Sequence, residues 1–348
     1  MDHELKLKEK RLHLGDLLEV IGAPRRPPLQ RVPGDGGHPG AAATACCPEL
    51  AGVASAPAAA LPLRTQPIGQ ARWWGLELEA AVRTWFGNDL HPNVGYGGKS
   101  YDALHATYEG SYFGFVTTMD VYGFQINNGQ RIVSSIWIVN RGGNDGDEKN
   151  EIMIGWQVFP QMYGDSNTHF FTHWTRDSTR TTGCYDMKCP GFELTPGSPL
   201  APGDVIRPVS DVNGARQKIT IKVFRDKPTG NWWKHYGFNR ASAAMGYYPA
   251  SLFTTLTEKA TNILFGGSAL AVDGVPSPAM GSGSLPSIMS DRAASMEGIS
   301  LIDEDGRVAP FDAETIKTET MSFCYAMTPI FGANSSRCVC GGHGGCVG

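Results

Sequence analysis

The sequence lacks the marks of several classes of protein. Only 18% of its 348 residues are charged, less than the usual quarter, and the formal net charge is −4. Lysines and arginines form no cluster longer than residues 8–11, so we expect no nucleic-acid partner. The alanine-rich residues 54–63 are too few, and too interrupted by prolines, to span a bilayer, so no membrane partner is expected. Residues 1–20 carry acids and bases throughout and lack the apolar centre of a signal peptide.

What the chain does contain is 43 glycines and 41% hydrophobic residues, a balance typical of a folded core with many turns. Its length allows one large domain with extensions. Residues 1–21 and 73–86 have the spacing of short helices, whereas residues 22–70 are rich in Pro, Gly, Ala and Arg without periodicity. Such a segment buries too little apolar surface to offset its ordering entropy. We therefore interpret residues 1–95 as a low-complexity, disordered extension with short helices.

From residue 96 onward the pattern predicts β-strands separated by turns rich in Gly, Asn and Asp. Strands are expected at residues 107–118, 119–126, 131–140, 152–159, 169–175, 218–223, 297–302 and 318–325. Residues 144–147 resemble a hairpin turn and lack the ligand spacing of a calcium loop. One helix is expected after Pro249, with Ser251 as its N-cap and Leu252, Leu256 and Ala260 on its packing face. These elements indicate an all-β sandwich or barrel over residues 96–348.

Residues 151–192 carry the most informative pattern. They include GWQVFPQMYGDSNTHFFTHWT followed by TTGCYDMKCPGF, and further blocks follow in order: GNWWKHYG, MGYYPASLF, FGGSA and SPAMGSGSLP. Together these blocks resemble the C-terminal domain of the neprosin family of plant glutamic peptidases. The resemblance spans residues 96–324 and implies an antiparallel β-sandwich of two packed sheets. It also implies peptide-bond hydrolysis at acid pH by two glutamates on the concave face of that sandwich.

The resemblance places both glutamates at substituted positions. In a carboxylate pair, one member activates water as a general base while the other, kept protonated, donates a proton. The family form Ile-Glu-Ala-Gly-Trp puts the first glutamate at Met153, and the form Trp-Gly-Gly-Glu puts the second at Ser268. A thioether and a lone hydroxyl cannot take over this chemistry. Glu151 is the candidate for a substitute carboxylate on the same strand face, but its displacement of roughly 7 Å would misplace an attacking water. Gln157 can bind a carbonyl but cannot act as a base.

Other residue sets have plainer interpretations. Ser268 misses the G-x-S-x-G elbow and has no evident His/Asp pair, so a polar strand residue is favoured over a nucleophile. His169 and His173 would lie about 13 Å apart in a strand, too far to share a metal ion. Residues 280–283 lack the ending of a phosphate loop, and no cofactor is expected. Aromatic residues in a sandwich more often belong to the core. The candidates for a binding groove are Trp156, Gln157, Trp174, Trp232 and Tyr247.

The eight cysteines favour an oxidising compartment. Cys184 and Cys189 lie five positions apart around a short polar tip and match a disulfide position of the family. The family also has a late pair, and by analogy Cys324 is paired with Cys338. The alternative is a zinc site, although the spacing is tighter than in common zinc knuckles. Its ligands would be Cys338, Cys340, His343 and Cys346.

Asn334 begins the one glycosylation sequon, which fits secretion. Together with the cysteines it indicates an extracellular or secretory location, although no signal peptide is recognised. We hypothesise that roughly the first 70 residues do not represent the start of the mature protein.

Three functions follow from these patterns. The first is a monomeric neprosin-like pseudoenzyme that has lost the glutamate pair and keeps a groove for a peptide or protein ligand. The second is an active peptidase that cuts near proline at acid pH with Glu151 or another carboxylate. The third is a cytosolic, zinc-stabilised binding module.

Overall fold

The computed structural model describes residues 98–142, 148–289, 291–312, 314–319, 322–332 and 336–347. The predicted N-terminal extension, the predicted turn at residues 144–147 and the Asn334 sequon lie outside these residues.

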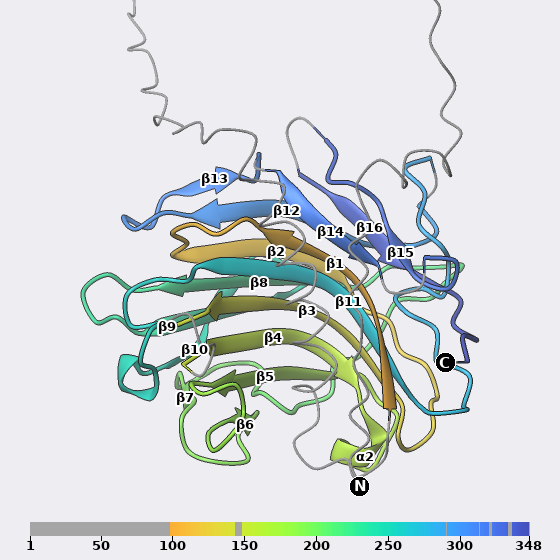
Figure 1. The fold of residues 1–348 in the computed structure, drawn as a ribbon, viewed down its shortest axis with the longest axis horizontal. Helices are drawn as coiled ribbons and strands as arrows, with labels where there is room; N and C mark the ends of the chain where they lie inside the picture. Colours follow the sequence, from red (N-terminus) through yellow and green to blue (C-terminus); the bar gives the residue numbers. More distant parts are fainter. Residues whose placement is uncertain are drawn as a thin grey trace, which may run out of the picture. The chain divides into compact units, whose positions relative to one another are not determined.

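The described residues form two antiparallel β-sheets packed face to face, which confirms the predicted sandwich (Figure 1). One sheet has seven strands. In spatial order these are β14 (Thr315–Glu319), β1 (Gly98–Thr107), β11 (Asn262–Val272), β3 (Arg131–Asn140), β4 (Asn150–Val158), β5 (His169–Thr175) and β6 (Cys184–Tyr185).

The other sheet has nine strands within the described ranges. In spatial order these are β15 (Ala326–Met327), β16 (Cys338–Gly341), β12 (Ala294–Ile302), β2 (Gly114–Asp120), β8 (Lys218–Arg225), β9 (Trp232–Phe238), β10 (Ala243–Tyr248) and β7 (Glu193–Leu194), with β13 (Val308–Pro310) paired to β12. In the described part of the chain no helix is long and apolar enough to cross a membrane.

Strand alternation divides the apolar side chains between two clusters. On β4, Ile152, Ile154 and Trp156 belong to the large core between the sheets, whereas Met153 belongs to a smaller cluster. Successive strand residues point to opposite faces, so this smaller cluster lies on the outer face of the seven-stranded sheet. Its buried members are Leu104, Ala106, Val133, Trp137, Val139, Met153, Phe171, Tyr185 and Leu264. We call this the outer-face cluster.

Three predicted strands and the helix differ from the structure. The predicted strand at 318–325 does not form, because β14 ends at Glu319 and residues 322–325 are turn and bend before β15. The predicted strands at 107–118 and 119–126 are replaced by β1 and β2, with irregular chain between and after them. The predicted helix is only the 3-10 turn Ala250–Leu252. The reason is that Oδ1 of Asn150 accepts hydrogen bonds from the backbone N–H groups of Thr254 and Thr255, at 2.8 and 3.0 Å. Those N–H groups therefore find a tertiary partner instead of helical carbonyls.

The described residues do contain one short α-helix, α2 (Pro160–Tyr163), directly after β4. Proline fits the first turn of a helix, where an N–H group has no partner, and Gly164 ends the helix in the left-handed conformation with φ of 82°.

Candidate functional site

Both positions assigned to glutamates lie on the outer face of the seven-stranded sheet, but they are not level with each other. Met153 is paired with Trp137, and Trp137 with Leu264. Ser268 is four residues further along β11, where it is paired with Val133. Four residues span roughly 13 Å along a strand. The two side chains therefore do not face each other across adjacent strand positions.

Gln157, in contrast, shares a row with Ser268. Val133 on β3 is paired with Gln157 on β4 and with Ser268 on β11, so the two residues lie two strands apart at the same level. Two strand spacings amount to about 9.6 Å. Among the predicted residues, Gln157 is thus the one that the fold brings nearest to Ser268.

The hydroxyl of Ser268 is held by a carboxylate on the neighbouring strand. Its Oγ donates a hydrogen bond of 2.7 Å to Oδ1 of Asp102, and it lies 3.1 Å from Oγ of Ser100. Ser100 also donates to Oδ1 of Asp102, at 3.0 Å. Ser268 and Asp102 are both buried, at 3% and 5% exposure. No described histidine forms a hydrogen bond with Ser268, so this arrangement is not a nucleophilic triad.

Gln157 belongs to a second hydrogen-bonded chain. Arg131 Nε donates to its Oε1 at 2.8 Å, and its Nε2 donates to the hydroxyl of Tyr163 at 2.7 Å. That hydroxyl in turn donates to Oδ2 of Asp186 at 2.7 Å. Burial raises the pKa of Asp186 to about 6. A carboxyl that titrates in the mildly acidic range is therefore connected to Gln157 through one phenol.

The guanidinium of Arg131 is buried among aromatic rings. Its Cζ lies 5.3, 5.6 and 5.7 Å from the ring centroids of Phe159, Phe171 and Tyr185. Such contacts with ring faces are favourable for a cation. Sequence reasoning missed Arg131, Tyr163, Asp186 and Asp102. A single acid or base inside an apolar strand pattern was the available signal at Asp102 and Arg131.

Glu151 lies two residues from Met153 along β4, and far from the row of Ser268. It is paired with Val139, which is paired with Asn262, six residues from Ser268 along β11. That separation is roughly 20 Å along the strand. Glu151 also forms an ion pair of 3.4 Å with Lys149. Its place in the fold therefore does not favour a substitute for the family carboxylate pair.

Three of the residues predicted to line a groove lie in the core between the sheets. Trp156 Nε1 donates to the carbonyl oxygen of Asp120 and Trp232 Nε1 to that of Leu256, each at 2.9 Å. Trp174 packs edge-on against Phe253. All three indole rings are buried in the core, so they do not line a groove. Gln157 remains on the outer face of the seven-stranded sheet, whereas Tyr247 lies on β10 of the other sheet.

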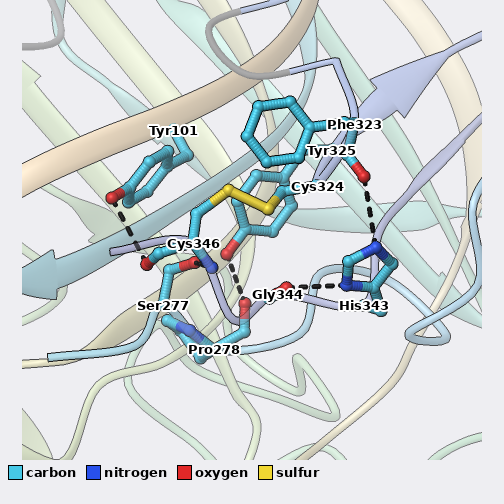
Figure 2. Close-up of a disulfide and its surroundings, with 9 residues drawn as sticks. All are labelled: Tyr101, Ser277, Pro278, Phe323, Cys324, Tyr325, His343, Gly344 and Cys346. Atoms are coloured by element: carbon cyan, nitrogen blue, oxygen red, sulfur yellow. Dashed lines mark hydrogen bonds between the residues drawn. A yellow bond between two sulfur atoms is a disulfide. The ribbon is translucent and has the colours of Figure 1, made fainter. Parts of the chain in front are cut away.

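The disulfide pattern confirms one prediction and corrects another. Cys184 and Cys189 are bonded, as predicted. Cys324 is bonded to Cys346 and not to Cys338 (Figure 2). Cys338 is buried on β16 opposite Met296.

The position of Cys346 explains this pairing. Its N–H donates to the hydroxyl of Ser277 and its carbonyl accepts the Ser277 N–H, at 3.1 and 2.9 Å (Figure 2). These bonds hold the C-terminal segment beside Cys324. The zinc alternative fails for the same reason, because Cys346 is no longer a thiolate ligand. The described residues contain no group of three or more His, Cys, Asp or Glu side chains that could hold a metal ion.

Comparison with protein families agrees with the motifs found in the sequence. The model of the neprosin family matches residues 128–343, more than half of the chain, and the chain belongs to the neprosin family. The family and the disulfides fit a secreted protein.

Two solved structures resemble the fold at low similarity. One is scytalido-glutamic peptidase with a peptide-based transition-state analogue, at 9% identity and a TM-score of 0.34, over 70% of this chain and 98% of that one. The other is SCP-B, of the eqolisin family of peptidases, with the tripeptide Ala-Ile-His, at 8% identity and a TM-score of 0.30, over 70% and 98%. We base the functional proposal on family membership and on this chain's own residues.

Proposed function

We propose that this chain is a neprosin-family domain that binds polypeptide on the outer face of its seven-stranded sheet and no longer hydrolyses it with a glutamate pair. The proposal rests on the two positions that the family motif assigns to glutamates, which hold a thioether, Met153, and a hydroxyl, Ser268. A thioether has no proton to exchange, and the Ser268 hydroxyl forms no hydrogen bond with a described histidine that could act as its general base.

The surroundings of these two residues support the loss of catalysis. Met153 packs in the outer-face cluster at 2% exposure, where an ionised carboxylate would need a partner. Ser268 makes its hydrogen bond to Asp102, so a buried carboxylate remains one strand away from the substituted position. Because these side chains are buried, a peptide can reach them only after part of the chain moves, and slow binding is expected.

The test is an assay of the secreted, disulfide-intact protein with a proline-rich peptide between pH 3 and 6. We expect binding, measured by fluorescence anisotropy of the labelled peptide, and no cleavage, measured by mass spectrometry. Cleavage that Glu151→Gln abolishes would establish the alternative, an active acid peptidase with a substitute carboxylate. Absence of any binding would remove the peptide-binding part of the proposal.

Two restored variants make the test sharper. Met153→Glu/Ser268→Glu rebuilds the pair where the family motif places it, and Gln157→Glu/Ser268→Glu builds it on one row of the sheet. If only the second gains cleavage, the shared row is the working geometry. If the wild type cleaves as fast as either variant, the substitutions are not what limits activity.

A further inference from the structure

A second surface, on the opposite side of the sandwich, has the composition of a ligand site. It is a depression of about 550 Å³ on the outer face of the nine-stranded sheet. Its lining residues come from β8, β9 and β10 and the turns beside them, and these strands are neighbours in the sheet (Figure 1). The residues that matter here are Phe224, Asp226, Asn231, Trp233, His235 and Tyr247. We call this the aromatic depression. None of these six belongs to the face considered under the proposed function.

The sheet register builds this depression from one row of aromatic residues. Phe224 on β8 is paired with Trp233 on β9, and Trp233 is paired with Tyr247 on β10. Strand neighbours are about 4.8 Å apart, so the row presents one ring per strand, close to the length of one sugar ring. The inward residues of β9, Trp232 and Lys234, are fully buried in the core, whereas Trp233 stays partly exposed. Side chains on a solvent-facing sheet surface are usually polar, so a row of three aromatic residues there indicates a binding surface.

The aromatic rings divide into a wall and a platform. The Phe224 ring forms the wall. It is already in contact with two side chains: Lys222 Nζ lies 4.6 Å from its centroid, and the His235 ring meets it edge-on at 5.3 Å. Trp233 and Tyr247 lie 4.7 Å apart with their planes tilted by 38°. Both rings line the depression, and we call this pair the platform.

Polar groups around the platform keep hydrogen-bonding capacity. Asn231 uses its Oδ1 to accept from the N–H of Ala250 at 2.9 Å, which leaves its Nδ2 as a donor. Asp226 uses Oδ2 for the N–H and hydroxyl of Thr229, at 3.1 and 2.6 Å, which leaves Oδ1 as an acceptor. Burial, and then the charge of Lys222, lowers the pKa of His235, so its neutral ring offers one donor and one acceptor.

From this arrangement we infer that the aromatic depression binds a neutral oligosaccharide of pyranose units. The C–H face of a pyranose carries partial positive charge and suits the negative face of an aromatic ring, while its hydroxyl edge needs several donors and acceptors at once. Trp233 and Tyr247 supply the aromatic ring faces. Asn231, Asp226 and His235 supply the hydrogen-bond donors and acceptors. Among the residues that line the depression, Asp226 carries a negative charge and none is a lysine or arginine, so the lining does not select an anionic glycan.

The experiment uses the full chain and three uncharged probes: cellohexaose, xylohexaose and mannohexaose. Tryptophan fluorescence and isothermal titration should show saturable binding of at least one probe at millimolar concentration or below. Trp233→Ala and Tyr247→Ala should each weaken that binding by about tenfold or more. Asn231→Asp keeps an acceptor for Ala250, removes the Nδ2 donor and adds a negative charge, so a several-fold loss of saccharide binding is expected.

Phe323→Ala is the matched control, because Phe323 is 64% exposed and lies outside the depression. It should leave saccharide binding unchanged. Failure of all three probes to bind overturns the inference, as does binding that Trp233→Ala leaves intact. A proline-rich peptide whose binding is lost in Trp233→Ala, with no saccharide bound, would assign the depression to peptide instead. Binding of peptide at the seven-stranded face is measured separately and does not depend on these outcomes.

Discussion

Ser268 Oγ lies 2.7 Å from Oδ1 of Asp102, directly across the pairing of β11 with β1. The position that the family motif assigns to a glutamate therefore holds a hydroxyl that donates to a carboxylate one strand away. The Asp102 carboxylate and the Ser268 hydroxyl are both buried, so their hydrogen bond contributes more to stability than one at the surface.

Ser268→Ala should destabilise the fold. Removing the hydroxyl takes one donor from the buried Asp102 carboxylate, and a lost hydrogen bond to a charged group costs about 1–3 kcal/mol. Urea unfolding of the variant should show a lower free energy with an unchanged denaturant slope. Ser300→Ala is the control, since that hydroxyl is exposed and bonds only its neighbour's carbonyl. Equal stability of both variants would mean that the Asp102 contact contributes nothing.

Asp186 should make the fold less stable at neutral than at acid pH. Its pKa is raised by burial to about 6, above the unfolded value near 4, so its contribution is present below pH 4 and is lost as the pH rises through 6. Between pH 4 and 7 this amounts to about 2 kcal/mol. Asp186→Asn should remove that part of the slope in unfolding experiments.

Asp177→Asn is the control for this pH effect. Hydrogen bonds from Thr181 and Thr182 outweigh burial and lower the pKa of Asp177 to about 2, so its stabilising contribution is lost only below about pH 4. The slope between pH 4 and 7 should therefore match the wild type. An unchanged slope in Asp186→Asn as well would contradict the assignment.

Lys234→Met should stabilise the protein. The side chain is fully buried, with Nζ 3.6 Å from the Tyr248 ring centroid and one hydrogen bond to the Trp232 carbonyl oxygen at 3.2 Å. Burial lowers its pKa well below the ordinary value, so this residue costs more stability as the pH falls. An apolar side chain of similar length should gain about 1–3 kcal/mol, with the gain larger at pH 5 than at pH 8. Lys222→Met, on the outward face of β8, should change little.

The Cys324–Cys346 disulfide should stabilise the fold more than the Cys184–Cys189 disulfide. Cys324 and Cys346 are separated by 22 positions, and Cys184 and Cys189 by 5. A disulfide stabilises a fold by lowering the entropy of the unfolded chain, by roughly 3 kcal/mol for the longer loop and roughly 2 kcal/mol for the shorter one. Thermal unfolding should therefore show a larger fall in Tm for Cys324→Ser/Cys346→Ser than for Cys184→Ser/Cys189→Ser.

Peptide mapping without reduction tests the connectivity itself. Cys338→Ala should leave the Cys324–Cys346 link intact, whereas a Cys324–Cys338 link would be lost. Burial raises the pKa of Cys340 to about 12, and Cys338 is buried beside it, so neither should react with iodoacetamide before unfolding. Alkylation of either residue in the native protein would contradict this packing.

The sequence by itself determined the class of fold and the family. Alternation on strands such as β3 and β4 separates residues of opposite faces, and that period is local. The ordered motifs also predicted the Cys184–Cys189 disulfide, which the structure confirms, and suggested Met153 and Ser268 as the positions of the family glutamates. Local spacing could not reveal the 3-10 turn at Ala250–Leu252, because its flanking N–H groups bond to Asn150, about a hundred positions away.

The tertiary structure decided which of those residues meet. Pairing of β11 with β3, and of β3 with β4, sets Ser268 level with Gln157 and away from Met153 and Glu151. The same kind of long-range contact sends Trp156 and Trp232 into the core, leaves Trp233 and Tyr247 outside, and brings Cys346 to Cys324. Register between strands distant in sequence depends on the packing of the whole sandwich, so no single stretch of the chain contains it.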